Sequence, residues 1–309
     1  MEVLNPGLLT TVQDTGRYGY QRYGIPPAGA ADSYALRVGN ILLGNKEDEA
    51  SLEITILGPT LRFEEENWIA LTGTDLGPYL NEQPLPLWET VHVNKGDVLS
   101  FRRPEKGMRV YLTIAGGINV PPALKSKATY LQGKLGGFCG RPLHGGDRIE
   151  TIPARAQKRR LPKRLIPSYG LHSLRVLVSS TGEHFSSVAV KTLLTSEYKI
   201  LPHSNRMGLR LTGSSIEHLK SADIISEPVC TGAIQVPGNG QPILLLSDRQ
   251  TTGGYTRIAT VISVDLPKAA QARPGDVISF VECTLEEAQQ AYCEQEELLA
   301  ALQEELQSL

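Results

Sequence analysis

The sequence predicts a mainly β protein built from two related barrels. Short runs rich in Val, Ile, Leu, Phe and Thr recur along its 309 residues, and Gly, Pro, Asn and Asp separate them. The chain has 30 glycines and 20 prolines, a proportion that favours tight turns over long helices. A heptapeptide that occurs twice points to a duplication, and the length suits two domains with a core each.

Eight segments are predicted to be strands, because each is apolar or alternating and is bounded by turn residues. They are Leu52 to Ile56, Trp68 to Leu71, Val98 to Phe101, Arg109 to Ile114, Arg175 to Val178, Ile243 to Leu246, Ile258 to Val264 and Val277 to Val281. Their spacing is typical of sandwiches or barrels and not of a doubly wound parallel sheet.

Two helices are predicted inside this β framework. The first runs from Asp32, whose side chain can cap the free amides, to Gly44, which permits a left-handed exit. Its apolar stripe consists of Ala35, Val38, Ile41 and Leu42. A shorter helix is expected from Leu266 to Ala272, before Pro274.

The C-terminal segment, residues 284–309, is predicted to be a long helix that Thr284 and Glu287 open as a capping box. An apolar stripe follows the heptad spacing and is interrupted by Gln295. Its members are Leu285, Ala288, Tyr292, Leu299, Leu302, Leu306 and Leu309. The stripe must cover either the protein's own barrel or a partner protein.

The heptapeptide at Lys95 to Phe101, KGDVLSF, recurs as PGDVISF at Pro274 to Phe280, with a weaker echo at Gly145 to Ile149. Each copy places a Gly-Asp turn before an alternating strand. The predicted domains are therefore a first barrel over 1–150, a linker over 151–170, a second barrel over 171–283 and the helix over 284–309. The linker is basic and contains three prolines, so it buries little surface, although a basic docking tail is the alternative.

Composition excludes several classes of function. A net charge of −2 gives no electrostatic reason to expect nucleic acid or a membrane as partner. The chain has neither a signal peptide pattern at its start nor a sufficiently long apolar run, so we expect a cytoplasmic protein. The scattered Cys139, Cys230, Cys283 and Cys293 predict neither a disulfide framework nor a metal site.

Known catalytic loops are absent from the sequence. Gly133 to Gly140 lacks the Lys-Ser/Thr ending of a phosphate loop, and GxGxxG, GxSxG and HExxH are missing. No lysine stands in a biotin-acceptor setting, so we expect no biotin attachment site. The isolated His184 and His203 leave proton transfer open, and no catalytic base can be assigned.

Glycine-rich segments loaded with polar groups are the candidate binding site. In the first half, QDTGR and GIPPAGAAD offer Asp14, Arg17 and Asp32, although Asp14 and Arg17 could instead pair with each other. In the second half, SNRMG and the stretch from Gly232 to Tyr255, which also contains Arg249, either line a pocket for a small amide-like ligand or bond to themselves. The predicted substrate-binding residues there are Asn205, Arg206, Gln235, Gln241, Asp248, Gln250, Thr251, Thr252 and Tyr255.

A series of ordered segments resembles the allophanate hydrolase subunit 2 family, also described as biotin-dependent carboxyltransferase-like. The matching segments are PGLLTTVQDTGRYGYQ, ALRVGNILLGN, LEITILGPTLRF, ALTG, YLTIAGGI, SNRMG and GAIQVPGNGQPILLLSDRQTTGGY. The resemblance implies two cyclophilin-like barrels with a few short helices. It also implies a smaller subunit 1 partner of the kinase-inhibitor type.

The same resemblance implies an activity. The expected one is that of the C subunit of an ATP-dependent 5-oxoprolinase, which opens 5-oxoproline to L-glutamate together with the A and B subunits. ATP would be a substrate of that complex, and the ligand a small lactam or amide. A biotin-dependent carboxyltransferase component acting on a urea-like amide and a non-catalytic antagonist of a kinase inhibitor are the alternatives.

Overall fold

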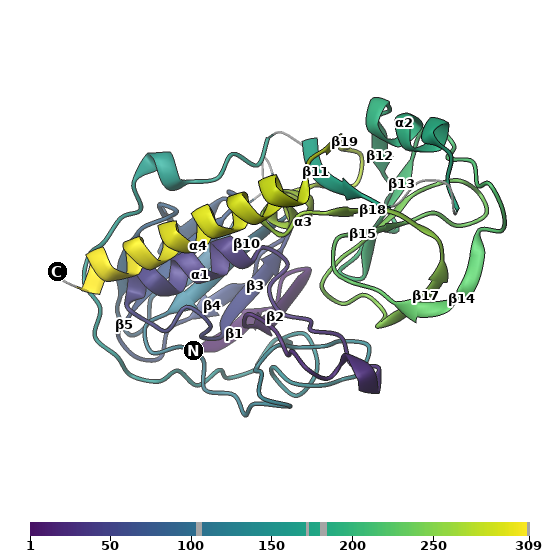
Figure 1. Cartoon of the computed structure of the whole chain (residues 1–309). Coiled ribbons are helices and arrows are strands. Elements are labelled where there is room, and N and C mark those ends of the chain that lie inside the picture. The colour runs from purple at the N-terminus through teal and green to yellow at the C-terminus, as the bar shows by residue number, and fades with distance from the viewer. Residues whose placement is uncertain (103–106, 171–172, 180–183, 308–309) are drawn as a thin grey trace. The chain divides into compact units, whose positions relative to one another are not determined.

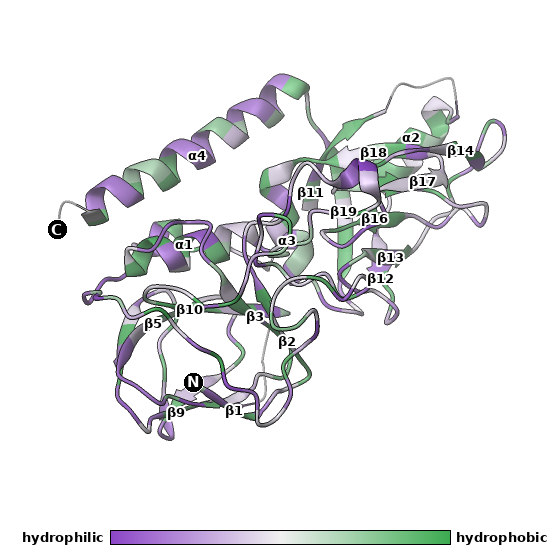
Figure 2. Ribbon diagram, turned by 90° about the horizontal axis from the view of Figure 1, so that it is seen from below, coloured by the Kyte–Doolittle hydropathy of each residue, from purple (hydrophilic) through white to green (hydrophobic). Residues whose placement is uncertain are grey.

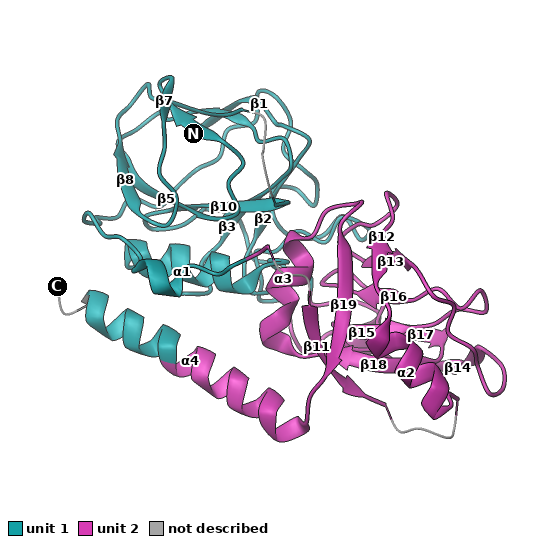
Figure 3. Ribbon diagram, turned by 90° about the horizontal axis from the view of Figure 1, so that it is seen from above, with its two compact units in different colours: residues 1–17, 28–168, 298–309 teal, residues 18–27, 169–297 magenta. Residues whose placement is uncertain are grey.

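The computed structural model describes residues 1–102, 107–170, 173–179 and 184–307. Two compact units divide the chain (Figure 3). The first contains residues 1–17, 28–168 and 298–309, and the second contains residues 18–27 and 169–297. The mainly β fold class is confirmed, and all eight predicted strands are present to within a few residues at their ends.

Two five-stranded sheets enclose the core of the first unit (Figure 1). One sheet consists, in spatial order, of β1 (Glu2–Asn5), β4 (Thr60–Arg62), β9 (Val98–Phe101), β6 (Pro78–Leu80) and β7 (Gln83–Pro84). The other consists of β2 (Leu9–Gln13), β3 (Ser51–Thr55), β10 (Arg109–Ile114), β5 (Asn67–Gly73) and β8 (Thr90–Val93). The facing sides contribute buried apolar side chains to one cluster, including Val12, Leu52, Leu61, Leu99 and Leu112. The core thus lies between the sheets.

Helix α1 (Ser33–Leu43) covers the outer side of the second sheet, against β5 and β10. Its ends are as predicted: the Oδ1 of Asp32 accepts from the amide of Ala35 at 3.0 Å, and Gly44 is left-handed. The hydroxyl of Thr72 in β5 donates to the carbonyl of Ala35 at 2.7 Å. This sheet therefore meets its helix through a polar side, and its apolar side faces the core.

The second unit is a closed seven-stranded barrel. Its strands, in spatial order, are β11 (Ser173–Val178), β18 (Arg257–Val261), β15 (Ala233–Gln235), β16 (Ile243–Leu245), β13 (Gly208–Thr212), β12 (Tyr198–Ile200) and β19 (Val277–Glu282). The strands β14 (Asp223–Pro228) and β17 (Thr252–Tyr255) form a separate ribbon. The predicted short helix is α3 (Leu266–Gln271). In this unit 3-10 turns cover Gln21–Tyr23 and Ser263–Asp265, and in the first unit one covers Lys163–Leu165.

Helix α2 (Ser187–Thr195) was not predicted. Ser186 caps it by accepting from the amide of Ala189 at 3.1 Å. Only Ala189 and Leu193 are buried, so the helix has a narrow apolar stripe that gives little periodic signal.

The repeated heptapeptide has the same local structure in both units. The Oδ2 of Asp97 accepts from the amide three residues earlier at 2.7 Å, and the Oδ2 of Asp276 does so at 2.8 Å. The weaker echo repeats the bond at Asp147, also at 2.7 Å. Gly96 and Gly275 both adopt positive φ angles, of 93° and 96°. The shared turn explains why Gly-Asp precedes each strand.

The C-terminal helix is α4 (Leu285–Gln307), so the stripe residue Leu309 lies outside the described residues. The capping box is confirmed, with Thr284 and Glu287 each accepting from the other's amide. Figure 2 shows apolar and polar residues alternating along this helix. Leu299, Leu302 and Leu306 are buried, whereas Leu285 and Tyr292 are exposed. Only the last part of the stripe is covered.

The segment 151–170, expected to be a linker, is partly bonded to the first unit. The amide of Thr90, in the edge strand β8, donates to the carbonyl of Arg159 at 2.9 Å, and the amide of Leu161 donates to the carbonyl of Trp88 at 2.8 Å. Leu161 is 1% exposed. The amino-acid composition of the segment did not reveal these bonds. They form because an edge strand has unpaired backbone groups that can bind a polar segment. The domain boundary itself stays a prediction.

Candidate functional site

The predicted site residues lie in both units. Asp14, Arg17 and Asp32 belong to the first unit. The second unit contains Asn205, Arg206, Gln235, Gln241, Asp248, Gln250, Thr251, Thr252 and Tyr255. Each group is described within its own unit.

Asp14 and Arg17 hold the segment from Ala123 to Ala128. The carboxylate of Asp14 accepts from the hydroxyl of Ser126 at 2.8 Å, and the guanidinium of Arg17 donates to the carbonyls of Ala123 and Ala128 at 3.1 and 2.6 Å. Arg17 is 1% exposed. Both side chains thus brace this distant segment, and their role in substrate binding stays a prediction.

Asp32 belongs to a buried network that the sequence did not reveal. Its amide donates to the phenol oxygen of Tyr111 at 2.8 Å, and that phenol donates to Glu53 at 2.7 Å. Arg109 lies 3.5 Å from the other oxygen of Glu53. All four side chains are at most 3% exposed. The one sequence signal was a Glu inside the strand LEIT, where alternation places it beside Ser51 and Thr55.

Burial and the nearby carboxylates of Glu53 and Asp32 raise the pKa of Tyr111 well above its usual range. Its phenol therefore stays protonated and able to donate. Three polar atoms on the same side of the sheet have no hydrogen-bond partner among the described residues: Gln13 Oε1, Ser51 Oγ and Thr55 Oγ1. Together with Glu53 and Tyr111 they form what we call the polar face of the first unit. The side chains of Gln13, Ser51 and Thr55 are all at most 5% exposed.

Arg206 and Asp248 bind each other. Nε and Nη2 of Arg206 lie 3.0 and 2.9 Å from the two carboxylate oxygens, and both side chains are at most 5% exposed. The fork of Arg206 thus faces a carboxylate of the protein itself, and a role of Arg206 in substrate binding stays a prediction. The fold brings Arg206 next to Asp248, which lies 42 residues away in the sequence, so the sequence alone did not reveal this pair.

Two other predicted residues shape loops. The Oδ1 of Asn205 accepts from the amide of Met207 at 2.8 Å. The side chain of Gln241 bonds both backbone groups of Gly213, at 2.9 and 3.3 Å. These amides satisfy local backbone groups, as turn-forming side chains do.

The remaining predicted residues cluster where the ribbon of β14 and β17 leaves the barrel. The Nε2 of Gln235 donates to the carbonyl of Tyr255 at 3.1 Å, and its Oε1 lies 3.4 Å from the Nε2 of Gln250. Gln235 is 1% exposed, whereas Gln250, Thr252 and Tyr255 are exposed. The structure thus brings the buried amide of Gln235 next to the exposed amide of Gln250, and amide groups of this kind suit a small polar ligand.

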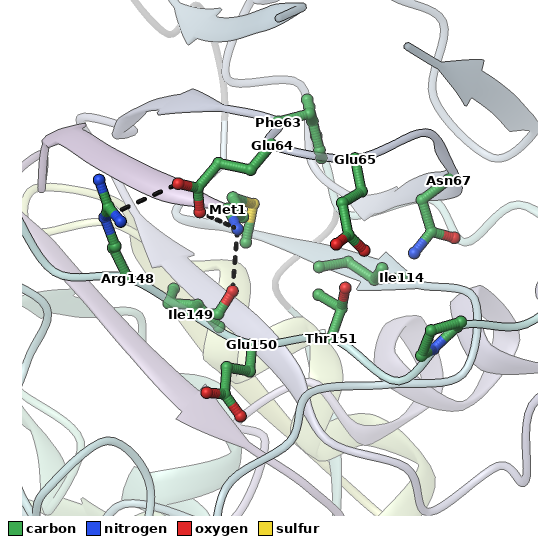
Figure 4. Close-up of a pocket in the computed structure, with 11 residues that line it drawn as sticks. Met1, Phe63, Glu64, Glu65, Asn67, Ile114, Arg148, Ile149, Glu150 and Thr151 are labelled. Carbon is green, nitrogen blue, oxygen red and sulfur yellow. Dashed lines mark hydrogen bonds and ion pairs between the residues drawn. The ribbon is translucent and has the colours of Figure 1, made fainter. Parts of the chain in front are cut away.

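A pocket of about 480 Å³ in the first unit lies elsewhere (Figure 4). Glu64, Glu65, Glu150 and Arg148 contribute its charged groups, and Glu64 binds the terminal ammonium of Met1 at 3.1 Å. None of the predicted site residues lines it. Its acidic wall does not suit an anionic substrate.

Over the described ranges, no group of three or more His, Cys, Asp or Glu side chains is arranged to hold a metal ion. In the same residues, no helix has the length and apolarity needed to cross a membrane.

Residues 23–282 match the family model described as carboxyltransferase domain, subdomain A and B. The 5-oxoprolinase C subunit of Escherichia coli is 38% identical over 308 residues, covering 96% of this chain and 97% of that protein. The protein of the same name from Haemophilus influenzae is 36% identical and is covered to 93%. The crystal structure of K. lactis urea amidolyase superposes with a TM-score of 0.93 at 32% identity, over 97% of this chain but 20% of that one.

Proposed function

This chain belongs to the carboxyltransferase domain family, subdomains A and B, and we propose that it is the C subunit of an ATP-dependent 5-oxoprolinase. In that role it opens the lactam of 5-oxoproline to L-glutamate within a complex of several proteins. The observation that carries the proposal is the 38% identity to a protein named as the C subunit of 5-oxoprolinase, which this chain covers to 97%.

The chemistry explains what such a site must provide. A five-membered lactam resists hydrolysis, so phosphorylation of its oxygen by ATP makes the ring carbon open to attack. Fixed donors are needed where negative charge develops, because they stabilise the transition state without reorganising. The amide cluster of Gln235 and Gln250 supplies such donors.

We propose that the partners are the kinase-inhibitor-type subunit 1, which is the B subunit of such a complex, and a separate A subunit, with ATP as a substrate of the complex. The lack of a phosphate loop in the sequence supports a nucleotide site shared with, or carried by, another protein of the complex. We expect the complex to work in the cytoplasm, since the four scattered cysteines suit a reducing compartment.

A second candidate is carboxyl transfer to a urea-like amide, favoured by the TM-score of 0.93 to the urea amidolyase. That reaction needs a carboxylated biotin from another protein, because this sequence has no acceptor lysine in a recognisable setting. The same amide-binding groups would then hold the urea-like acceptor.

The test is reconstitution from purified proteins. The chain is combined with the proposed A and B subunits, and glutamate release is followed with ATP and 5-oxoproline, omitting one component at a time. We expect turnover only in the complete mixture. Turnover by this chain alone would overturn the shared site, and no turnover in the complete mixture would overturn the 5-oxoprolinase assignment. Carboxylation of urea by the same chain with a carboxybiotin carrier would instead favour the second candidate.

A further inference from the structure

Asp248 and Arg249 are neighbours in one turn and are both buried, but among the described residues only Asp248 has a partner of opposite charge. The carboxylate of Asp248 is bound by Arg206 through two bonds. Arg249 is equally buried, at 2% exposed, but its one hydrogen bond is from Nε to the carbonyl of Val229 at 3.3 Å. Its Nη1 is buried without a partner among the described residues.

A buried cation without a counter-charge is costly, because desolvation is not offset by an ion pair. Within the part of the chain that the structure describes, no carboxylate lies within ion-pair distance of Arg249. Burial accordingly lowers the pKa of its guanidinium, although the nearby Cys230 and Tyr18 act in the other direction. Arg206, in contrast, binds the carboxylate of Asp248 through two bonds.

A second cation, Arg257, approaches Cys230, the residue whose charge also acts on Arg249. The Nη1 of Arg257 is 4.0 Å from the sulfur of Cys230, and the buried Nε of Arg257 has no partner among the described residues. Cys230 is exposed, and Tyr18, in the same unit, is 71% exposed. Both arginines thus have an exposed neighbour in Cys230.

We propose that Arg249, with Arg257 near the same cysteine, is an oxyanion site that accepts a carboxylate or phosphoryl group. A planar guanidinium with free N–H groups matches either group through two parallel bonds. The amides of Gln235 and Gln250 in the same loops are placed to bind an uncharged part of the ligand. The inference does not depend on which reaction the complex catalyses.

Cys230 provides a probe inside the site that does not require activity. Purified chain is alkylated with iodoacetate, an anion, or with iodoacetamide, its neutral counterpart, and the rate at each cysteine is followed by peptide mass spectrometry. Cys293, exposed on α4 in the same unit, is the internal reference. We expect the ratio of iodoacetate to iodoacetamide rates to be at least about 5-fold higher at Cys230, or ~1 kcal/mol of attraction.

Two competitors distinguish the sources of the anion. Protection of Cys230 by inorganic phosphate alone indicates a phosphoryl group, protection by 5-oxoproline alone indicates a carboxylate, and protection by both indicates the shared chemistry. Arg249→Gln should reduce the rate ratio to that of Cys293, and Arg249→Lys should keep part of it. Arg210→Gln, at an exposed arginine of β13, is the matched control and should leave the ratio unchanged.

Equal ratios at Cys230 and Cys293 in the unaltered chain, with no protection by either anion, would overturn the proposal, whether or not the variants fold. A raised ratio that persists in Arg249→Gln would overturn the assignment to Arg249. Either result leaves the reconstitution test untouched, so the failure of this site and of the proposed function can be told apart.

Discussion

Arg206 and Asp248 form a buried, two-point ion pair that joins the turn after β12 to the turn after β16. Both arginine nitrogens that face Asp248 lie within 3.0 Å of its oxygens. Breaking such a pair leaves a charge buried without compensation, so the pair is costly to disturb even where its net contribution is small.

Arg206→Lys should therefore lower the stability of the protein without changing the rate of the reaction. Lysine keeps the charge but loses the planar fork, and we expect the free energy of unfolding to fall by about 1–3 kcal/mol. Denaturant unfolding measures the loss, and Arg210→Lys at the exposed arginine of β13 is the control. The rate per folded complex should stay unchanged. A reduced rate at unchanged stability would contradict this role and indicate that Arg206 binds the ligand.

Asp265 should control stability in acid. Burial acts to raise its pKa, but the bonds from Arg175 and Lys268 outweigh burial and lower it. Folding thus favours the charged form, so this stabilisation is present above the ordinary value of 3.8 and is lost as the pH falls through the lower folded-state pKa.

Asp265→Asn should have a lower free energy of unfolding than the unaltered protein at about pH 6. Between about pH 6 and about pH 2 its free energy of unfolding should then fall less steeply. Asp223→Asn, at an exposed residue of β14, is the control. Parallel pH profiles for Asp265→Asn and the unaltered protein would contradict this role.

Tyr34 should contribute to the loss of stability at alkaline pH. Burial, and then the charge of Asp32, raises its pKa to about 12, and its phenol donates to the carbonyl of Leu165 at 2.8 Å. Below the ordinary value of 10.0 the phenol is neutral in both states, so the pH does not change its contribution to stability. As the pH rises further, the unfolded chain loses this proton first, and stability falls until the folded pKa is passed.

Tyr34→Phe should flatten this decline while costing about 1 kcal/mol at neutral pH for the lost hydrogen bond. Unfolding followed by circular dichroism between about pH 8 and about pH 12 provides the measurement. Tyr23→Phe, at a phenol that is 65% exposed, is the control. An unchanged slope in Tyr34→Phe would show that other groups cause the alkaline loss.

Thr90 should protect the segment 151–170 from protease. Its hydroxyl donates to the carbonyl of Gln157 at 2.8 Å and accepts from the amide of Arg159 at 2.7 Å. Thr90→Val removes both bonds at similar volume, so trypsin should cut after Lys158 or Arg159 several-fold faster. The domain boundary is tested in the same digest: early cuts within residues 52–114 of the unaltered protein would contradict it.

The sequence by itself determined the local structure. The Gly-Asp heptapeptide, the cap at Asp32 and the box of Thr284 and Glu287 depend on residues a few positions apart, so their geometry is the same wherever the fold places them. Alternation likewise located the strands, because a period of two assigns one side to the core. The ordered segments were also sufficient to identify the family.

Only the tertiary structure decided the fate of the charged and polar residues. Arg206 and Arg249 both lie in polar, glycine-rich loops. Arg206 binds a carboxylate 42 residues away in the sequence, whereas Arg249 donates to a single carbonyl. The partners of Glu53, Tyr111 and Asp32 are likewise brought from separate elements. A side chain's role as brace or ligand-binding group depends on which neighbours satisfy it, and those neighbours are set by strand order and loop packing, which local sequence does not encode.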